Sequence, residues 1–328
     1  MDKSEFLDRL AAVVQKHLGP VVIENARQLT GGAQSATWRF DVIGASGRRT
    51  LISRGSETVE QISTGLSKPV EAEIQQAAWS VGVPVAEVLF TLAPEDQLGE
   101  GYIMACIDGE SIPRRILRDE RFQTVREELA AQCGRVLGQI HSIQAPESLP
   151  ILNCEQQLAA LEKQFRDYDY AVPAFELAFR WLKNNMPVLG NSGVVHGDFR
   201  NGNFLVTAER GINGVLDWEL AHVGDPMEDL GWLCVNSWRF GNRNLPVGGF
   251  GTRDDLFRAY EAATGTPVDA DRVRFWELFG VLKWGVICLY MCCTDLNSGV
   301  RSVERAAIGR RISEVETDLL AMLTGRAV

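Results

Sequence analysis

The segment 194–219 constrains this chain of 328 residues more than any other part of its sequence. It carries three polar residues in a fixed order, because Asn203 follows Asp198 at the fifth position and Asp217 follows Asn203 at the fourteenth. Short apolar runs at 194–195, 204–206 and 214–216 flank these residues. The pattern predicts short buried strands with a polar turn at 207–211. Asp217 should therefore lie at the end of a strand, close to the loop that holds Asp198 and Asn203.

This set of side chains suits phosphoryl transfer, a reaction in which the protein contributes positioning and charge neutralisation more than covalent chemistry. One carboxylate has to orient the attacking hydroxyl and accept its proton, and we assign this role to Asp198. A second carboxylate and an amide oxygen have to hold Mg²⁺ on the nucleotide phosphates, and we assign these roles to Asp217 and Asn203. Each residue alone would be ordinary turn or strand-end chemistry. The three in this order match the catalytic and metal-binding loops of kinases.

Three motifs carry a wider resemblance: His196-Gly-Asp-Phe-Arg-x-Gly-Asn203, Leu216-Asp-Trp-Glu219 and Gly224-Asp-Pro-x-x-Asp-Leu230. Together they resemble the aminoglycoside phosphotransferase family of the kinase-like superfamily of small-molecule kinases, and most of all its acyl-CoA-dehydrogenase-associated branch. The resemblance implies an α+β, two-lobed protein-kinase-like fold with a five-stranded antiparallel sheet in the small lobe and a large, mainly helical lobe. It implies ATP as phosphoryl donor, Mg²⁺ as cofactor and a small-molecule hydroxyl as acceptor. It also implies that His196 braces the catalytic loop and that Asp225 and Asp229 are architectural.

The chain is too long for one typical core and suits two lobes. We expect a nucleotide-binding lobe at 1–104, a hinge at 105–110 and a catalytic and substrate-binding lobe at 111–328. Met104 and Cys106 are expected beside the adenine, which would bind backbone groups of this segment. Helices are expected at 2–18, 70–80, 125–141, 158–186 with a break near 168–173, 253–264, 271–294 and 301–324.

A glycine-rich turn between two apolar stretches is the candidate cover for the nucleotide. It contains Gly31, Gly32 and Ser35. Glycine lets backbone N–H groups approach phosphate oxygens closely, although Gly-Gly is also an ordinary hairpin turn. The family that this chain resembles usually has asparagine after the serine, whereas this chain has Ala36.

Arg54 is expected to replace the lysine that kinases carry on their third strand. The predicted strand 50–54 contains no lysine, and arginine can bind phosphate through two parallel hydrogen bonds. A solvated arginine at the strand end is the alternative. Counting back from Gly82-Val-Pro-Val85, which resembles a family segment, places Glu71 where the partner glutamate belongs. Glu73 is the alternative partner of Arg54.

Composition indicates which classes of binding partner and which cell compartment to expect. The formal net charge of −10 disfavours nucleic acid and mildly favours a cationic or neutral substrate. The most apolar stretch, 284–294, has only 11 residues without charge, which predicts a buried helix and no membrane association. Seven cysteines without a CxxC motif, and an N-terminus without an apolar signal segment, predict reduced thiols in a cytoplasmic protein. The sequence leaves the oligomeric state unknown.

Two departures from the kinase pattern support an alternative function, a nucleotide-binding pseudokinase with a regulatory role. These departures are Arg54 in place of lysine and Ala36 in place of asparagine. The presence of Asp198 together with both metal ligands favours the enzyme, because a pure binder needs no base. A protein acceptor is disfavoured because no Ala-Pro-Glu segment follows Asp217. The acceptor itself stays open among aminoglycoside-like, choline-like and hydroxyacyl molecules.

Overall fold

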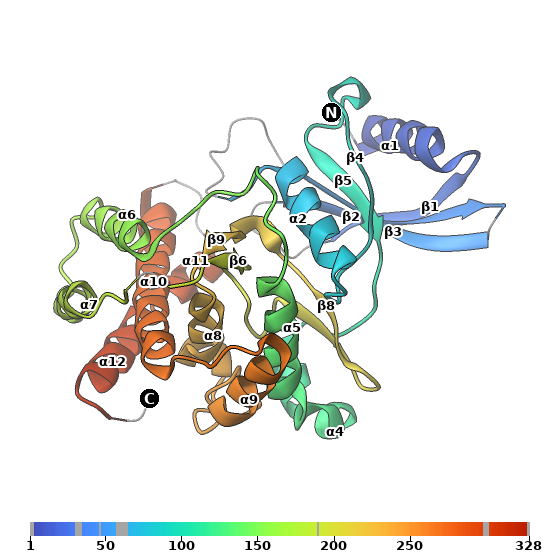
Figure 1. Cartoon of the computed structure of the whole chain (residues 1–328). Coiled ribbons are helices and arrows are strands. Elements are labelled where there is room, and N and C mark those ends of the chain that lie inside the picture. The colour runs from blue at the N-terminus through green and yellow to red at the C-terminus, as the bar shows by residue number, and fades with distance from the viewer. Residues whose placement is uncertain are drawn as a thin grey trace.

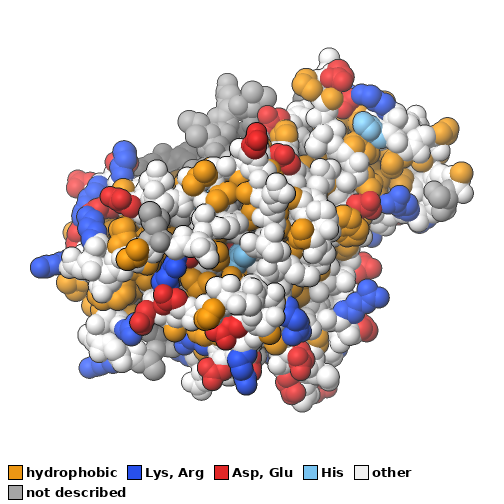
Figure 2. Space-filling model, viewed as in Figure 1, with side chains coloured by type: hydrophobic (Ala, Val, Ile, Leu, Met, Phe, Trp, Pro, Cys, Tyr) orange, Lys and Arg blue, Asp and Glu red, His pale blue; other side chains and the backbone are white. Residues whose placement is uncertain are grey.

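The computed structural model describes residues 3–29, 35–45, 47–56, 65–188, 190–297 and 302–326. In this part of the chain a small sheet lobe meets a larger helical lobe (Figure 1). The expected α+β, two-lobed arrangement is therefore confirmed. Acidic and basic side chains are interspersed over the face of the molecule drawn in Figure 2.

The small lobe is a five-stranded antiparallel sheet in the order β1-β2-β3-β5-β4, as the sequence predicts. Alternate residues of its central strands are apolar, so one face of the sheet is buried, with Phe40 and Leu51 fully enclosed. Leu10 and Val14 of α1 pack on that face and complete the core of this lobe. The strands are β1 (Val22–Gln28), β2 (Ser35–Gly44), β3 (Gly47–Ser56), β4 (Val88–Thr91) and β5 (Gly101–Ala105), and α1 spans Lys3–Leu18.

Helix α2 (Lys68–Ser80) connects the two cores. Ala72 faces the sheet beside Val88 and Tyr102, while Ile74 and Ala78 belong to the core of the large lobe. The backbone adds a further link, because the Val215 N–H donates to the Pro84 carbonyl over 2.6 Å. The position of α2 between the lobes matters for the site, since its first turn faces the cleft.

The large lobe is mainly helical. Its helices are α3 (Pro113–Arg118), α4 (Gln123–Arg126), α5 (Leu129–His141), α6 (Cys154–Arg166), α7 (Pro173–Asn184), α8 (Met227–Cys234), α9 (Arg253–Thr264), α10 (Ala270–Asn297), α11 (Val303–Gly309) and α12 (Ile312–Leu323). The prediction of a single helix at 125–141 is wrong, because the segment contains the end of α4 and all of α5, and the helical pattern predicted at 301–324 forms two helices, α11 and α12. In the segment 301–324, α11 ends at Gly309, which lies against α10. A Cβ at Gly309 would lie 2.7 Å from the Cys292 Cβ. Only glycine permits this approach, and the chain turns there before α12.

Helix α10 runs through the large lobe and packs against α8, α11 and α12. Among the described residues it is the one helix long and apolar enough to cross a membrane, but 67% of its most apolar window is buried inside the protein. Val286, Cys288 and Leu289, from the stretch predicted as a buried helix, are all enclosed. The apolar character of this helix is therefore explained by the core that it fills.

Two antiparallel strand pairs position the polar segment of the sequence. Strand β6 (Gly193–Val195) pairs with β9 (His222–Gly224), and β7 (Phe204–Thr207) pairs with β8 (Gly211–Val215). The loop between β6 and β7 carries Asp198 and Asn203, and Asp217 follows β8. The predicted strands and the polar turn between them are confirmed.

Candidate active site

The carboxylate of Asp198 is held by three hydrogen-bond donors. Its Oδ1 accepts from Trp232 Nε1 at 2.7 Å and from Arg200 Nε at 3.0 Å. Its Oδ2 accepts from the side-chain amide of Asn203. The side chain keeps 15% of its surface exposed, so it is fixed in direction and still reachable. A carboxylate in this state is suited to orient a hydroxyl group and accept its proton.

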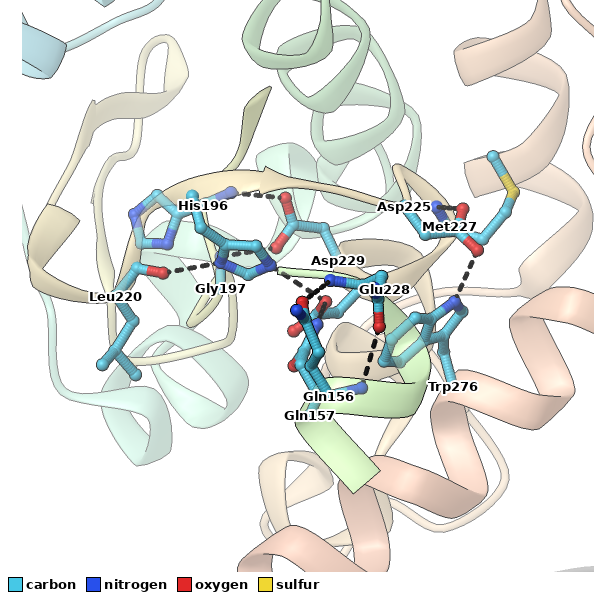
Figure 3. A network of polar contacts seen from close by, with 12 residues as sticks. Gln156, Gln157, His196, Gly197, Leu220, Asp225, Met227, Glu228, Asp229 and Trp276 are labelled. Atoms are coloured by element: carbon cyan, nitrogen blue, oxygen red, sulfur yellow. Dashed lines mark hydrogen bonds and ion pairs between the residues drawn. The ribbon is translucent and has the colours of Figure 1, made fainter. Parts of the chain in front are cut away.

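The backbone of the loop before Asp198 is anchored from α8. Asp229 accepts from the N–H groups of His196 at 2.8 Å and Gly197 at 3.0 Å (Figure 3), and its Oδ2 lies 3.1 Å from His141 Nε2. Burial alone would raise the pKa of Asp229, but His141 and the loop N–H groups hold that pKa below its ordinary value. Asp229 therefore braces the loop, in line with the architectural role expected for it.

Gly197 and His196 each fit one position in this loop. Gly197 has a φ of +79°, and a Cβ there would lie 2.4 Å from the Leu220 carbonyl oxygen, so a side chain has no room. His196 is fully buried, its Nδ1 accepts from the Asp198 N–H, and its Nε2 donates to the Leu216 carbonyl. The imidazole thus ties the loop to the strand end before Asp217, which is the bracing expected of it.

The β7–β8 hairpin brings Asn203 and Asp217 together. Phe204 pairs with Val215, and the next residue along, Leu216, donates its N–H to the Asn203 carbonyl at 2.8 Å. Asp217 follows directly with a φ of +66°, a left-handed conformation that costs a non-glycine residue about 1 kcal/mol or more. The hairpin and the short turn after it maintain this conformation. The carboxylate therefore lies at the open end of the hairpin, next to Asn203, and we call this position the hairpin mouth.

Arg54 joins the lobes at this point. Its Nη2 lies 2.5 Å from Asp217 Oδ1, and its Nε lies 2.6 Å from Glu71 Oε1. The expected pairing with Glu71 is confirmed, whereas Glu73 instead accepts a hydrogen bond from Ser148. The alternative of a solvated strand-end arginine is therefore wrong. Arg54 is mostly buried between carboxylates that come from both lobes.

Lys68 is a member of the site that the sequence analysis missed. Its Nζ lies 2.6 Å from Glu71 Oε2, and both side chains are buried. Tyr102 donates its hydroxyl to Glu71 Oε1 at 3.0 Å, so the Glu71 carboxylate is engaged at both oxygens. The strand lacks a lysine, but the first turn of α2 supplies one. The spacing of three residues between Lys68 and Glu71 on a predicted helix was the available signal.

The residues expected to cover the nucleotide phosphates and to lie beside the adenine are only partly described. Gly31 and Gly32 lie outside the described residues, and so does the side chain of Ser35, whose backbone begins β2. Met104 lies on β5, where its sulfur accepts from Gln75 at 3.5 Å. The Cys106 N–H donates to the Thr50 carbonyl at 3.1 Å. A base could not take a hydrogen bond from that N–H without breaking the link to β3.

Three indole rings form a wall on one side of Asp198. The ring centroids of Trp232 and Trp238 are 5.2 Å apart, and those of Trp238 and Trp284 are 4.9 Å apart. A cation lies over each ring: Lys283 over Trp232, Arg200 over Trp238 and Arg311 over Trp284. The buried indole N–H groups of Trp238 and Trp284 have no hydrogen-bond partner in the described structure. Each ring of this aromatic wall therefore carries a cation on its face.

The two lobes, the inter-lobe arginine and the Asp198–Asn203–Asp217 constellation define a kinase-like phosphotransferase fold. The chain belongs to the APH phosphotransferase enzyme family, whose pattern matches residues 26–276. This membership confirms the resemblance seen in the sequence motifs and makes the protein a phosphotransferase.

Solved structures agree with this fold. A proposed aminoglycoside phosphotransferase from Ralstonia eutropha JMP134 superposes with a TM-score of 0.74 and 19% identity, and the match covers 97% of this chain and 98% of that one. An amicoumacin kinase, solved with AMP-PNP, Ca²⁺ and Ami, has a TM-score of 0.60 and 15% identity, with 97% and 96% covered.

A sequence relative comes from a much longer protein. Acyl-CoA dehydrogenase family member 10 of Mus musculus is 27% identical over 238 residues, which are 66% of this chain and 22% of that relative. The chain thus spans about a fifth of that relative, and the similarity concerns this part alone.

Proposed function

We propose that this protein transfers the γ-phosphoryl group of ATP to a hydroxyl group of a small molecule, with Mg²⁺ as cofactor. The observation that carries the proposal is the placement of Asp198. Its carboxylate is fixed by Trp232, Arg200 and Asn203, and it stands beside the hairpin mouth where Asn203 and Asp217 converge. A nucleotide-binding role alone gives no reason for a carboxylate oriented in this way.

The residues at the hairpin mouth fit a hard cation. The Asn203 amide nitrogen donates to the Asp198 backbone and carboxylate, so its oxygen faces away from Asp198 and is suited to accept a metal ion. The Asp217 carboxylate has a third of its surface exposed. Two protein oxygens suffice for Mg²⁺, which takes its other ligands from phosphates and water. When bound, the ion would neutralise charge on the transferring phosphoryl group.

The remaining roles fall to named side chains. Asp198 would orient the acceptor hydroxyl and take its proton as the oxygen attacks the γ-phosphorus. Arg54 is held by Glu71 on one side and by Asp217 on the other. Nucleotide phosphates would offer its guanidinium a new anionic partner and release Asp217 for the metal ion. Lys68 would keep Glu71 in place during this exchange, because it binds the other carboxylate oxygen.

The aromatic wall points to an anionic acceptor, contrary to the cationic or neutral substrate that net charge alone favours. Arg200 contacts both Asp198 and the Trp238 ring, with Lys283 and Arg311 on the neighbouring rings. The cations on this wall favour a carboxylate or phosphate on the acceptor. Aminoglycosides and choline would instead bring like charges together here. We therefore favour a hydroxylated organic acid or one of its esters with an anionic carrier.

The test is ADP release from ATP and Mg²⁺ with two matched panels of acceptors, hydroxylated carboxylates or phosphates and hydroxylated amines. We expect stimulation by members of the anionic panel, and none in the Asp198→Asn variant. Stimulation by amines alone would refute the acceptor class and leave the transferase intact. ATP binding without phosphoryl transfer to any acceptor would support the second candidate function, a nucleotide-binding pseudokinase. The Arg54–Asp217 ion pair favours that alternative, because it occupies a metal ligand.

A further inference from the structure

A cavity opens in the large lobe, away from the sheet (Figure 1), and nothing in the proposed reaction uses it. Its volume is about 990 Å³, enough for a small organic molecule. It lies among the start of α9, the start of α10 and the end of α12, close to the C-terminus of the chain (Figure 1). Apolar side chains of Phe257, Val273 and Met322 form part of its walls.

The cavity is strongly basic in a protein that is acidic as a whole. Five arginines line it, Arg239, Arg243, Arg253, Arg274 and Arg326. The lining contains only two carboxylates, which leaves an excess of three positive charges in a chain whose formal net charge is −10. The first turns of α9 and α10 also border the cavity, and helix N-termini carry partial positive charge.

The inner part of the cavity is a fixed basic wall. Arg239 is 2% exposed, and it is held by the Cys234 carbonyl and by Glu277 Oε1 at 3.0 Å. Arg253 lies 2.7 Å from Glu277 Oε2, so one buried carboxylate serves two guanidinium groups. The other carboxylate, Asp271, is exposed at the rim. Glu277 thus fixes both guanidinium groups as part of this wall.

The outer arginines are free to turn toward a ligand. Arg243, Arg274 and Arg326 are exposed and form no ion pair within the described part of the chain, and Arg274 donates only to the Met322 carbonyl. We propose that this cavity binds a small organic polyanion, a molecule with at least two phosphate or carboxylate groups on a body with an apolar face. Guanidinium groups suit these oxygens, and the apolar walls suit such a body. The proposal does not depend on the transfer reaction.

The experiment is calorimetric titration of the full chain at low salt without Mg²⁺, with tripolyphosphate and citrate as separate probes. They distinguish phosphate from carboxylate preference. We expect one site for at least one probe, weakened by added salt. The double variant Arg243→Ala/Arg326→Ala should bind at least about tenfold more weakly, because two charged contacts are removed. Within the described residues neither side chain forms a hydrogen bond or ion pair, so their removal should leave the fold intact. Arg243→Lys/Arg326→Lys should retain most of the affinity.

Two controls locate the site. Arg258→Ala removes an exposed arginine of α9 that does not line the cavity, and it should leave binding unchanged. Arg54→Ala removes the arginine of the nucleotide cleft and should also leave probe binding unchanged. Binding that is lost in Arg54→Ala but kept in the Arg243/Arg326 double alanine variant would place the probe in the cleft and overturn the proposal. Absence of binding by both probes would overturn it as well.

Discussion

Asp198 has donors on both carboxylate oxygens, two from its own loop and one from α8. Trp232 lies on α8, Arg200 follows in the same loop, and Asn203 precedes β7. These contacts fix the direction of the carboxylate. The residue can therefore receive a proton without any rearrangement of the loop.

Replacing Asp198 with asparagine should separate chemistry from binding. Asparagine keeps the size and an acceptor oxygen but cannot take a proton at neutral pH. We expect kcat to fall by about 10³-fold, within the usual range for a general base, with little change in the Kd for ATP. Single-turnover kinetics and nucleotide titration measure the two quantities. A loss of ATP affinity that accounted for the whole effect would contradict this role.

We expect Lys68 to affect ATP binding by holding Glu71, and to have no effect on binding of the acceptor. In Lys68→Met, the buried Glu71 loses one of two cationic partners, and the remaining Arg54 should be held more tightly by Glu71. We expect the affinity for ATP to fall by about tenfold, with KM for the acceptor unchanged and with rescue by Lys68→Arg.

The matched control for this variant is Lys163→Met, which removes an exposed lysine paired with Asp167 on the surface. Such a pair contributes little to stability, so the control should behave like the wild type. An equal loss of ATP affinity in both variants would refute a specific role for Lys68.

At the scale of elements, the packing of α5 on α9 depends on two glycines. A Cβ at Gly134 would lie 2.4 Å from the Leu256 carbonyl oxygen, which belongs to the backbone. A Cβ at Gly138 would lie 2.9 Å from the Ala263 Cβ, which is a side chain. The two positions thus differ in what would have to move. Helix α5 ends in His141, so this packing also positions the loop brace formed with Asp229.

The two glycines give a matched pair of variants. Gly134→Ala should destabilise the protein by about 2–3 kcal/mol, since the backbone of α9 has to shift. Gly138→Ala should lower the free energy of unfolding by less. Adding Ala263→Gly to this variant should restore part of the loss, because it removes the side chain that the new Cβ meets. Urea unfolding of the three variants measures the free energies. Equal costs for both glycines, or rescue of Gly134→Ala by Ala263→Gly, would contradict this account of the interface.

At the scale of the whole molecule, a buried ion pair links the strand pair β6–β9 with α8 and α6. His222 Nε2 lies 3.2 Å from Glu228 Oε2, which also accepts from Gln157 at 2.8 Å. Burial would lower the pKa of His222, but Glu228 raises it above its ordinary value. Burial would raise the pKa of Glu228, but His222 lowers it below its ordinary value. The pair therefore favours the doubly charged state.

Stability should accordingly change with pH on both sides of neutrality. The contribution of His222 is complete below its unfolded pKa of about 6.5 and is lost as pH rises through the higher folded pKa. The contribution of Glu228 is present above its unfolded pKa of about 4.3 and is lost as pH falls through the lower folded pKa. His222→Gln should cost about 3 kcal/mol near pH 6 and remove the alkaline part of the profile. An unchanged alkaline limb in urea unfolding of this variant would contradict the assignment.

Much of the site follows from the sequence because its residues are close along the chain. Asp198, Asn203 and Asp217 lie within 20 residues, and a hairpin of alternating apolar residues brings them together by local pairing alone. A pairing of Arg54 with a glutamate near the start of this helix could also be inferred, by counting back from Gly82-Val-Pro-Val85, but Glu71 and Glu73 both remained candidates. Lys68 was overlooked because its burial depends on how α2 meets the cleft.

The sequence by itself determined the order of the polar residues, the strands around them and the family to which the chain belongs. It could do so because period-two apolar patterns and short hairpins act over a few residues. Only the tertiary structure decided which of Glu71 and Glu73 pairs with Arg54, how Asp229 braces the loop, and that cations stand over the tryptophans beside Asp198. These contacts join residues tens of positions apart, and their geometry depends on how the lobes and helices pack. Net charge indicated a cationic or neutral substrate, whereas the local field near Asp198 depends on where the few arginines and lysines are placed.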